Sequence, residues 1–393
     1  MKRVALVLAG GAARGAYEVG VVEHVVHEVA NALKHDIRFD ILCGTSVGAL
    51  NACGLAAWAH EGRDAVKRMR DVWHELDLAS LVRTDVRGVL SALRLRRGDF
   101  PAREGGILDP TGIEAVVKSS IPFEHIQENL EAGLVHALTV STTHVSSGRT
   151  VVFVQTADGK LPPWSQDPTI EPRAVRITAN HALASAAIPI LFRSVRIDGE
   201  FHCDGGLRQN VPLSPARRLG ADAVLVINPR FITDEPVLPK EERFPGPLFL
   251  LGKTLNALLL DRIDTDLARL ESVNKILDAG TRAYGPDFVA KLNAALGHKP
   301  GHGLRPMRAM LVRASEDIGA LAAKFVRDHA TELSGLTGNI IRRLAASGDD
   351  PNESDLLSYV LFDGRFAKIL IDLGRADAEA RHDELVQFFR ALA

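Results

Sequence analysis

Residues 39–52 read FDILCGTSVGALNA, and this stretch decides the fold. The mostly apolar run Phe39–Cys43 is typical of a buried strand, and the residues after the pentapeptide GTSVG favour a helix. A sharp turn from strand to helix needs small residues two positions away on each side of the residue that it exposes, and Gly44 and Gly48 supply them. The pattern predicts a nucleophile elbow that presents Ser46, as in serine hydrolases. A plain glycine-rich turn is the alternative for the pentapeptide taken alone.

The first half of the chain alternates short β-branched or apolar runs with longer amphipathic segments, which is typical of an α/β sheet covered by helices on both faces. The dipeptide Asp198-Gly199 between two short runs predicts a tight hairpin. We expect strands at residues 4–8, 39–43, 134–142, 150–155, 195–197, 201–203 and 223–228, and helices at residues 16–33, 49–60, 64–76 and 111–119.

The chain of 393 residues exceeds the size at which a single core usually stops growing, so we expect more than one region. Composition divides it into a catalytic core at residues 1–232, a linker at residues 233–247 and a mainly helical C-terminal region at residues 248–393. Four prolines and mixed charges mark the linker as a surface segment. Within the C-terminal region, residues 307–312 could add an edge strand to the core sheet, and residues 366–393 predict one or two amphipathic helices.

Composition also restricts the function. The formal net charge of −2 lacks the basic excess of a nucleic-acid-binding protein, so no nucleic-acid partner is expected. Cys43, Cys53 and Cys203 are too few and too irregular for a disulfide framework or a zinc site, which favours a reducing, cytoplasmic location. The apolar run Val4–Ala9 is shorter than the core of a secretory signal, and no stretch reaches the roughly 18 apolar residues of a membrane span.

A second glycine-rich turn, GGAARG at residues 10–15, lies between the first expected strand and the first helix. Small residues free backbone N–H groups there to hold an anion. The turn is interpreted as a dinucleotide-binding loop, as the oxyanion hole of Ser46, or as a plain tight turn. A dinucleotide site needs an acidic residue at the end of the second strand. That strand ends in the elbow and has Asp40 at its beginning, so the oxyanion hole is favoured.

A third motif, Asp204-Gly205-Gly206, ends the predicted hairpin. A carboxylate on a bare glycine turn can point into a cleft, where partial burial lets it act as a general base toward Ser46. An aspartate that only caps its own turn is the alternative. His202, two residues earlier on the same strand face, is a competing base in a triad.

Taken together and in this order, GGAARG, GTSVG and DGG resemble the motifs of the patatin-like phospholipase family, whose members carry a Ser-Asp dyad. Two flanking segments, ASAAIP at residues 184–189 and NVP at residues 210–212, are similar to that family as well. The resemblance covers about residues 1–230 and implies a three-layer α/β/α core with a central, mostly parallel sheet. The residues beyond it share only a general likeness to longer bacterial members.

The resemblance implies a role for each motif residue. Ser46 is the expected nucleophile, Asp204 is its base, and the backbone of Gly10, Gly11 and Ala12 forms the oxyanion hole. Ala12 departs from the family, which usually has a third glycine at that position. The supporting residues are expected to be Arg14, Gly15, Gly44, Gly48, Gly205 and Gly206.

The implied activity is lipid acyl hydrolysis of the phospholipase A or lysophospholipase type, through an acyl-enzyme and without a metal or organic cofactor. The expected substrate is a phospholipid or another acyl lipid. An acyl thioesterase and a catalytically silent scaffold that binds lipid or protein are alternatives. A dinucleotide-dependent oxidoreductase is a less favoured one.

Lipid esters lie at interfaces, so an enzyme without a membrane span needs apolar surface for peripheral membrane contact. Residues 247–260, PLFLLGKTLNALLL, are the best candidate. They are interpreted either as a helix buried against the core or as a segment that borders the acyl channel or the membrane. The helical C-terminal region also offers a surface for a homodimer.

Overall fold

The structure, a computed structural model, describes most of the chain. The described residues are 2–81, 83–84, 108–162, 164, 168–232, 263–298, 303–330 and 354–392. The predicted linker at residues 233–247 and the apolar segment at residues 247–260 lie outside them. Among the described residues, no helix combines the length and the apolar character needed to cross a membrane.

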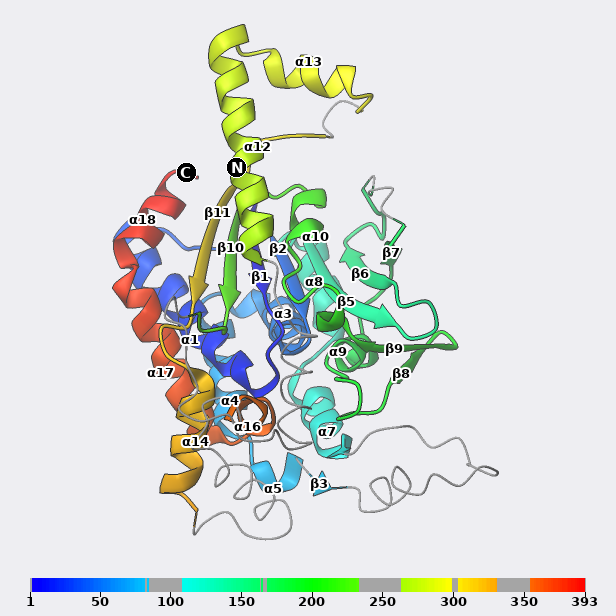
Figure 1. The fold of residues 1–393 in the computed structure, drawn as a ribbon, viewed down its shortest axis with the longest axis vertical. Helices are drawn as coiled ribbons and strands as arrows, with labels where there is room; N and C mark the ends of the chain where they lie inside the picture. Colours follow the sequence, from blue (N-terminus) through cyan, green and yellow to red (C-terminus); the bar gives the residue numbers. More distant parts are fainter. Residues whose placement is uncertain are drawn as a thin grey trace, which may run out of the picture.

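A nine-stranded, mostly parallel sheet forms the centre of the molecule (Figure 1). Its strands are β1 Val4–Leu8, β2 Ile41–Thr45, β5 Ala137–His144, β6 Thr150–Thr156, β7 Ile170–Ala174, β8 Val195–Ile197, β9 Glu200–Asp204, β10 Ala223–Asn228 and β11 Arg308–Arg313. The main path runs in the order β11-β10-β1-β2-β5-β6-β7, and the hairpin β8-β9 joins it at β5. The first five strands of this path are parallel, whereas β6 and β9 are antiparallel to β5. A separate two-stranded sheet pairs β3 Arg83–Thr84 with β4 Leu108–Asp109.

Helices cover both faces of this sheet. In the first part of the chain they are α1 Ala16–His24, α2 Ala30–Leu33, α3 Val47–Ala57, α4 Asp64–His74, α5 Leu78–Leu81, α7 Thr111–Ser120, α8 Glu124–Glu131, α9 Ala179–Ser185 and α10 Leu213–Arg218. In the later part they are α12 Ile263–Tyr284, α13 Phe288–Ala295, α14 Ile318–Asp328, α16 Ser354–Val360, α17 Gly364–Ala380 and α18 His382–Arg390.

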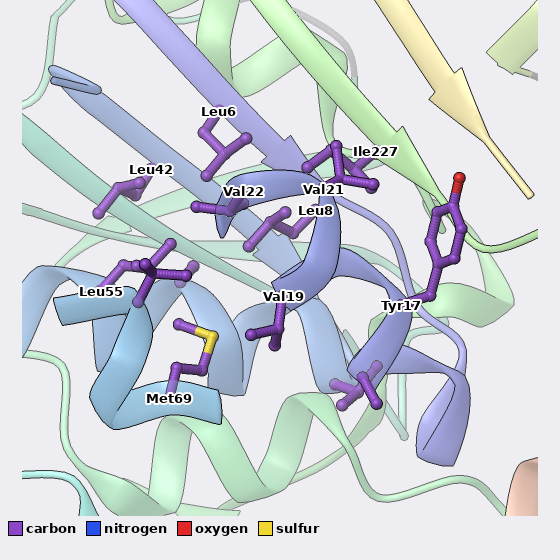
Figure 2. Close-up of a cluster of buried hydrophobic side chains, with 14 of the residues drawn as sticks. Leu6, Leu8, Tyr17, Val19, Val21, Val22, Leu42, Leu55, Met69 and Ile227 are labelled. Carbon is purple, nitrogen blue, oxygen red and sulfur yellow. The ribbon is translucent and has the colours of Figure 1, made fainter. Parts of the chain in front are cut away.

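The alternation of side chains along β1 shows how the two faces are filled. Leu6 and Leu8 pack into the larger core, which includes residues of α1, α3 and α17, whereas Ala5 and Val7 face the smaller core with α10 and α12. Figure 2 shows Leu6 and Leu8 among side chains of the larger core, including Val22 of α1. Because both faces are covered, every residue of β1 is buried and the strand is apolar throughout.

The C-terminal region packs directly on this core. Strand β11 pairs in parallel with β10, from Ala223 opposite Arg308 to Asn228 opposite Arg313. Helix α17 packs against α1 at one side of the sheet (Figure 1). The division into a core that ends at residue 232, a linker and a C-terminal region stays a prediction from the sequence.

The predicted fold class, a three-layer α/β/α core with a central, mostly parallel sheet and a mainly helical C-terminal region, is confirmed. Boundaries differ by a few residues. Strand β2 continues to Thr45, because Gly44 and Thr45 still pair with β5. The helix expected at residues 16–33 contains one π-helical turn, Val25–Val29, between α1 and α2.

Candidate active site

Ser46 lies between the end of β2 and the start of α3. Its backbone adopts φ 54° and ψ −130°, a conformation that residues with a side chain rarely adopt and that costs of the order of 1–3 kcal/mol. The Ser46 carbonyl accepts the N–H groups of Ala49 at 2.9 Å and Leu50 at 3.4 Å, which starts the helix. Strand, strained residue and helix follow each other as in a nucleophile elbow.

Two glycines make this turn sterically feasible. A methyl group on Gly44 would collide with the carbonyl of Gly48, and one on Gly48 would collide with the carbonyl of Leu8 at the end of β1. Gly15 touches the elbow from the neighbouring loop, since a methyl group there would lie 2.5 Å from the Val47 side chain. The elbow therefore packs against the end of β1 with no space for larger residues.

Strand pairing brings Asp204 to the elbow, because β2 and β9 both pair with β5. The Ser46 hydroxyl donates a hydrogen bond of 2.7 Å to Asp204 Oδ2. The other carboxylate oxygen, Oδ1, accepts the N–H of Gly206 at 2.7 Å. Gly205 and Gly206 begin the 3-10 turn Gly205–Leu207, which follows β9 directly.

Burial makes the Asp204 carboxyl group a weaker acid than an aspartate in water. The side chain is fully buried, and this burial raises the pKa of Asp204 to about 7, although the hydrogen bonds from Ser46 and Gly206 lower it. A carboxylate with a raised pKa is a better proton acceptor than one in water. The pair can therefore serve as nucleophile and general base near neutral pH.

The loop at residues 10–15 joins β1 to α1 beside the elbow. The N–H of Gly10 donates to the carbonyl of Asn210 at 3.2 Å, and the Asn210 side chain donates to the carbonyl of Gly10 at 3.4 Å. Ala12 has φ 49°, in the left-handed region that favours glycine. Gly10 and Ala12 thus lie close to Ser46: a methyl group on Gly10 would be 3.1 Å from the Ser46 Cβ, and Ala12 lines the same pocket as Ser46.

Arg14 anchors this loop to the C-terminal region. Its side chain is buried, and its Nε donates a hydrogen bond of 2.7 Å to the Ser358 hydroxyl of α16. The guanidinium carbon lies 4.2 Å from the centre of the Tyr359 ring, a cation–π contact. The predicted supporting residue therefore has partners that are more than 340 positions away in the sequence.

Ser185 holds the backbone of Ser46 in place. The Ser46 N–H donates to Ser185 Oγ at 2.8 Å, and the Ser185 hydroxyl donates to the carbonyl of Ser141 at 2.6 Å. The sequence identifies Ser185 and Asn210 only as members of segments that flank the motifs. It predicts no contact between either residue and the residues of the site. The family likeness of those segments was the signal that could have singled them out.

His202, the competing base, contacts Thr142 and Phe153 rather than Ser46. Its Nδ1 lies 3.1 Å from the Thr142 hydroxyl, and its ring lies against that of Phe153. Burial, more than any other factor, lowers the pKa of His202 to about 4, which keeps the ring neutral. Within the described residues, no hydrogen bond joins His202 to Ser46 or to the Asp204 carboxylate.

Asp40 lies far from the glycine-rich loop. Its carboxylate accepts the N–H of Val4 at 2.7 Å, at the start of β1, whereas the loop follows the end of that five-residue strand. Five strand residues span about 16 Å. Asp40 therefore does not lie where a dinucleotide loop needs its ribose-binding acid. In the described part of the chain, no group of three or more His, Cys, Asp or Glu side chains could hold a metal ion.

An apolar pocket of about 550 Å³, open solvent included, lies beside Ser46. Glu114 and Arg193, whose side chains form an ion pair of 2.9 Å, are its charged residues. Its apolar walls include Ala12, Val47, Leu50, Ile113, Leu183, Phe192 and Phe362. Its lining is mostly apolar, with few polar groups, as is typical of sites that bind apolar ligands.

The serine lies on a strand-to-helix elbow beside an apolar pocket, and its hydroxyl is hydrogen-bonded to a buried aspartate. This arrangement is typical of hydrolases that form acyl-enzymes. Residues 6–217, more than half of the chain, match the family described as patatin-like phospholipase. The chain belongs to the patatin-like phospholipase family, whose domains typically hydrolyse lipids.

Among solved structures, the chain is similar to the crystal structure of VipD from Legionella pneumophila, with a TM-score of 0.31 and 14% sequence identity. The match covers 79% of this chain and 61% of the VipD chain. The chain thus spans less than two thirds of the length of that protein.

Proposed function

We propose that this protein is a lipid acyl hydrolase of the phospholipase A or lysophospholipase type, which cleaves carboxylic esters through a Ser46-Asp204 dyad. The observation that carries the proposal is the 2.7 Å hydrogen bond from the Ser46 hydroxyl to Asp204 Oδ2. It joins a nucleophile to a buried base beside an apolar pocket in which an acyl chain can lie. Membership of the family supports lipid hydrolysis in general.

The reaction has two steps. Asp204 Oδ2 accepts the hydroxyl proton while Ser46 Oγ attacks the carbonyl carbon of the ester, and the carbonyl oxygen becomes an oxyanion. The C–O bond of the ester then breaks, and the leaving alkoxide takes the proton from Asp204. In the second step Asp204 accepts a proton from water, which attacks the acyl-enzyme. The fatty acid leaves, and Ser46 regains its proton.

The oxyanion needs backbone donors that are not already engaged. The N–H of Gly10 donates to Asn210, so we assign the oxyanion to the N–H groups of Gly11 and Ala12. The N-terminus of α3, which begins directly after Ser46, adds a favourable dipole. Gly10 keeps a supporting role, because its two hydrogen bonds with Asn210 hold the loop beside the elbow.

The test compares the native chain with Ser46→Ala, Asp204→Asn and His202→Ala. A fluorophosphonate probe is expected to label the native chain and His202→Ala but not Ser46→Ala. Mass spectrometry of the products is expected to show fatty acid released from phospholipid or lysophospholipid by the native chain and by His202→Ala only. Release that persists in Ser46→Ala would overturn the proposal. Loss in His202→Ala, with full activity in Asp204→Asn, would replace the dyad by a histidine-dependent mechanism.

Three further expectations from the sequence remain proposals. They are peripheral membrane contact, formation of a homodimer and a cytoplasmic location. The segment at residues 247–260, on which the first was based, lies outside the described residues.

A further inference from the structure

A wide groove opens at the end of the sheet opposite to Ser46. It measures about 2680 Å³, open solvent included, and lies between the turn after β6, the end of α10 and the residues that follow α13. Arg3 in its wall directly precedes β1, whereas Ser46 follows the end of β2, which runs parallel to β1. Figure 1 shows α12 and α13 at the end of the sheet where the chain begins, away from α7 at the candidate active site. The groove is therefore distinct from the pocket beside Ser46.

The walls of this groove carry an excess of positive charge. Among the described residues, five cationic side chains and two carboxylates line it. The cations are Arg3, Lys160, Arg217, Arg218 and Arg305, and the carboxylates are Asp40 and Asp158. Lys160 and Asp158 form an ion pair of 3.7 Å, so the excess lies with the arginines. The chain as a whole has a formal net charge of −2, so the positive charge is a local feature.

Arg3 and Arg305 converge on one point of the wall, Gly220. A methyl group on Gly220 would lie 3.0 Å from Arg3 Nη1 and 3.8 Å from Arg305 Nη2, so both guanidinium groups border the same small space. Burial, more than any other factor, lowers the pKa of Arg305, and the charges of Arg3 and Arg217 lower it further, against the effect of Asp222. Like charges held together in this way repel each other, and a bound anion would relieve that repulsion.

The carboxylates beside these arginines are bonded to the backbone. Asp222 Oδ2 accepts the N–H of Arg3 at 2.8 Å, and Asp40 Oδ2 accepts the N–H of Val4 at 2.7 Å, so both hold the start of β1. In the part of the chain that the structure describes, no carboxylate forms an ion pair with the guanidinium group of Arg3, Arg217 or Arg305. These groups therefore keep donors for an added anion.

The dipole of α10 explains only part of this arrangement. Arg217 lies in the last turn of that helix, where a cation is favourable. Arg305 donates to the carbonyls of Arg217 and Ala221 at 3.0 Å each, which satisfies the helix end and fixes the position of its own charge. Arg3 comes from the start of the chain and adds a further positive charge to a helix end that already has its cations.

A phosphate group matches these three arginines in charge and in shape. A phosphomonoester carries a charge of about −1.5 to −2 at neutral pH and three acceptor oxygens. Arginine binds such oxygens through pairs of parallel hydrogen bonds. A carboxylate has one charge and two oxygens, so a single arginine is enough for it.

We propose that Arg3, Arg217 and Arg305 bind the phosphate group of a phosphomonoester, either free in solution or in a lipid headgroup. The site lies apart from Ser46, so the proposal goes beyond ester hydrolysis and does not depend on it.

The first experiment measures binding of glycerol phosphate by isothermal titration calorimetry, with glycerol as the uncharged control. The native chain is expected to bind only the phosphate, and less tightly as the salt concentration rises. Arg3→Gln and Arg217→Gln are each expected to weaken binding about tenfold or more, because each removes charged hydrogen bonds. Arg3→Lys keeps the charge and is expected to lose less. Arg68→Gln, an exposed arginine of α4 that pairs with Glu61 at 2.8 Å, is the control without effect.

The second experiment identifies the source of the phosphate. In the Ser46→Ala background, co-sedimentation is measured with vesicles of phosphatidylcholine alone or mixed with phosphatidic acid, whose headgroup is a phosphomonoester. Binding of glycerol phosphate shows that a free phosphomonoester is sufficient. Co-sedimentation that needs phosphatidic acid and is lost in Arg3→Gln, without binding of glycerol phosphate, assigns the phosphate to a lipid headgroup. Either result supports the site.

Two results would overturn the proposal. One is that the native chain binds neither glycerol phosphate nor the vesicles with phosphatidic acid. The other is equal binding by Arg3→Gln, Arg217→Gln and Arg68→Gln. Thermal unfolding confirms that each variant is folded. Neither experiment measures ester turnover, so failure of the proposed function would leave both results valid, and ester hydrolysis by Arg3→Gln is expected to equal that of the native chain.

Discussion

At the scale of single residues, Ser46 and Ala12 both have a positive φ angle, which is unfavourable for residues other than glycine. Their φ angles are 54° and 49°, although neither residue is glycine. At Ser46 the strain falls on the residue that we propose as the nucleophile, which glycine could not replace because it has no hydroxyl. Ala12 has no polar side chain, but it belongs to the same buried apolar cluster as Tyr359 and Val360 of α16. This apolar environment gives a physical reason for an alanine where the family usually has glycine.

Strain at Ser46 predicts that replacement by glycine gives a more stable protein than replacement by alanine, the reverse of the usual order within a helix. Ser46→Gly is expected to have a free energy of unfolding about 1 kcal/mol above that of Ser46→Ala, because glycine relieves more strain than it adds to the entropy of the unfolded chain. Urea-induced unfolding of both variants measures this difference. At Ser272, an exposed position within α12, glycine is expected to be the less stable of the two by about 1 kcal/mol. The same order at both positions would contradict strain at the elbow.

Burial of Asp204 predicts how activity depends on pH. The base must be ionised, and burial raises the pKa of Asp204 to about 7. We expect kcat/KM to fall about tenfold per pH unit below that value and to level off above it. A profile that stays flat down to pH 5 would contradict Asp204 as a buried general base.

The same raised pKa predicts a pH-dependent stability. The folded state holds the proton of Asp204 more tightly than the unfolded state, so the carboxyl group destabilises the fold increasingly as the pH rises from about 4 to about 7. Asp204→Asn removes this effect. Its free energy of unfolding relative to the native chain is expected to rise across this window by up to about 4 kcal/mol, and to stay constant above it. Urea unfolding at several pH values measures the difference.

At the scale of elements, the contact between α16 and the loop at residues 10–15, to which we assign the oxyanion, predicts an effect on turnover rather than on binding. Ser358→Ala and Tyr359→Leu each remove one partner of Arg14. A loop displaced by a fraction of an ångström loses its fit to the transition state, so we expect kcat to fall about tenfold or more with KM nearly unchanged. Steady-state kinetics with a water-soluble ester measure both constants. Ser272→Ala is the control, and a rise in KM alone would indicate contact with substrate instead.

The sequence predicts those strands and turns that are determined by a short stretch of neighbouring residues. Short apolar runs predict β1 and β10 to the residue, and GTSVG and DGG predict two turns that the structure joins by a hydrogen bond. Family likeness was needed to pair Ser46 with Asp204, because the spacing of 158 residues contains no such information. Phe362 and Ser358 could not be predicted. Their roles arise from packing between distant segments, and phenylalanine or serine in a helical stretch is ordinary.

At the scale of the whole molecule, two helices from opposite ends of the chain cross with their backbones in contact. A methyl group on Gly374 of α17 would collide with the carbonyl of Tyr17 in α1, and one on Gly20 would collide with the carbonyl of Ile371. The Tyr17 hydroxyl donates to Asp377 at 2.9 Å next to this crossing. Because α1 follows the loop at residues 10–15 directly, the C-terminal helix supports the candidate site as well as the sheet.

This crossing predicts that Gly374→Ala disturbs stability and activity together. The added methyl group forces α17 away from α1, and we expect a loss of about 1–3 kcal/mol in the free energy of unfolding, as for other overpacked interfaces. Activity is expected to fall as well, since α1 follows the loop at residues 10–15 that we propose to hold the oxyanion. Lys368→Ala, on the exposed face of α17, is expected to stay within about 0.5 kcal/mol of the native chain. Unchanged unfolding and turnover in Gly374→Ala would show instead that the C-terminal region can separate from the core without consequence for the active site.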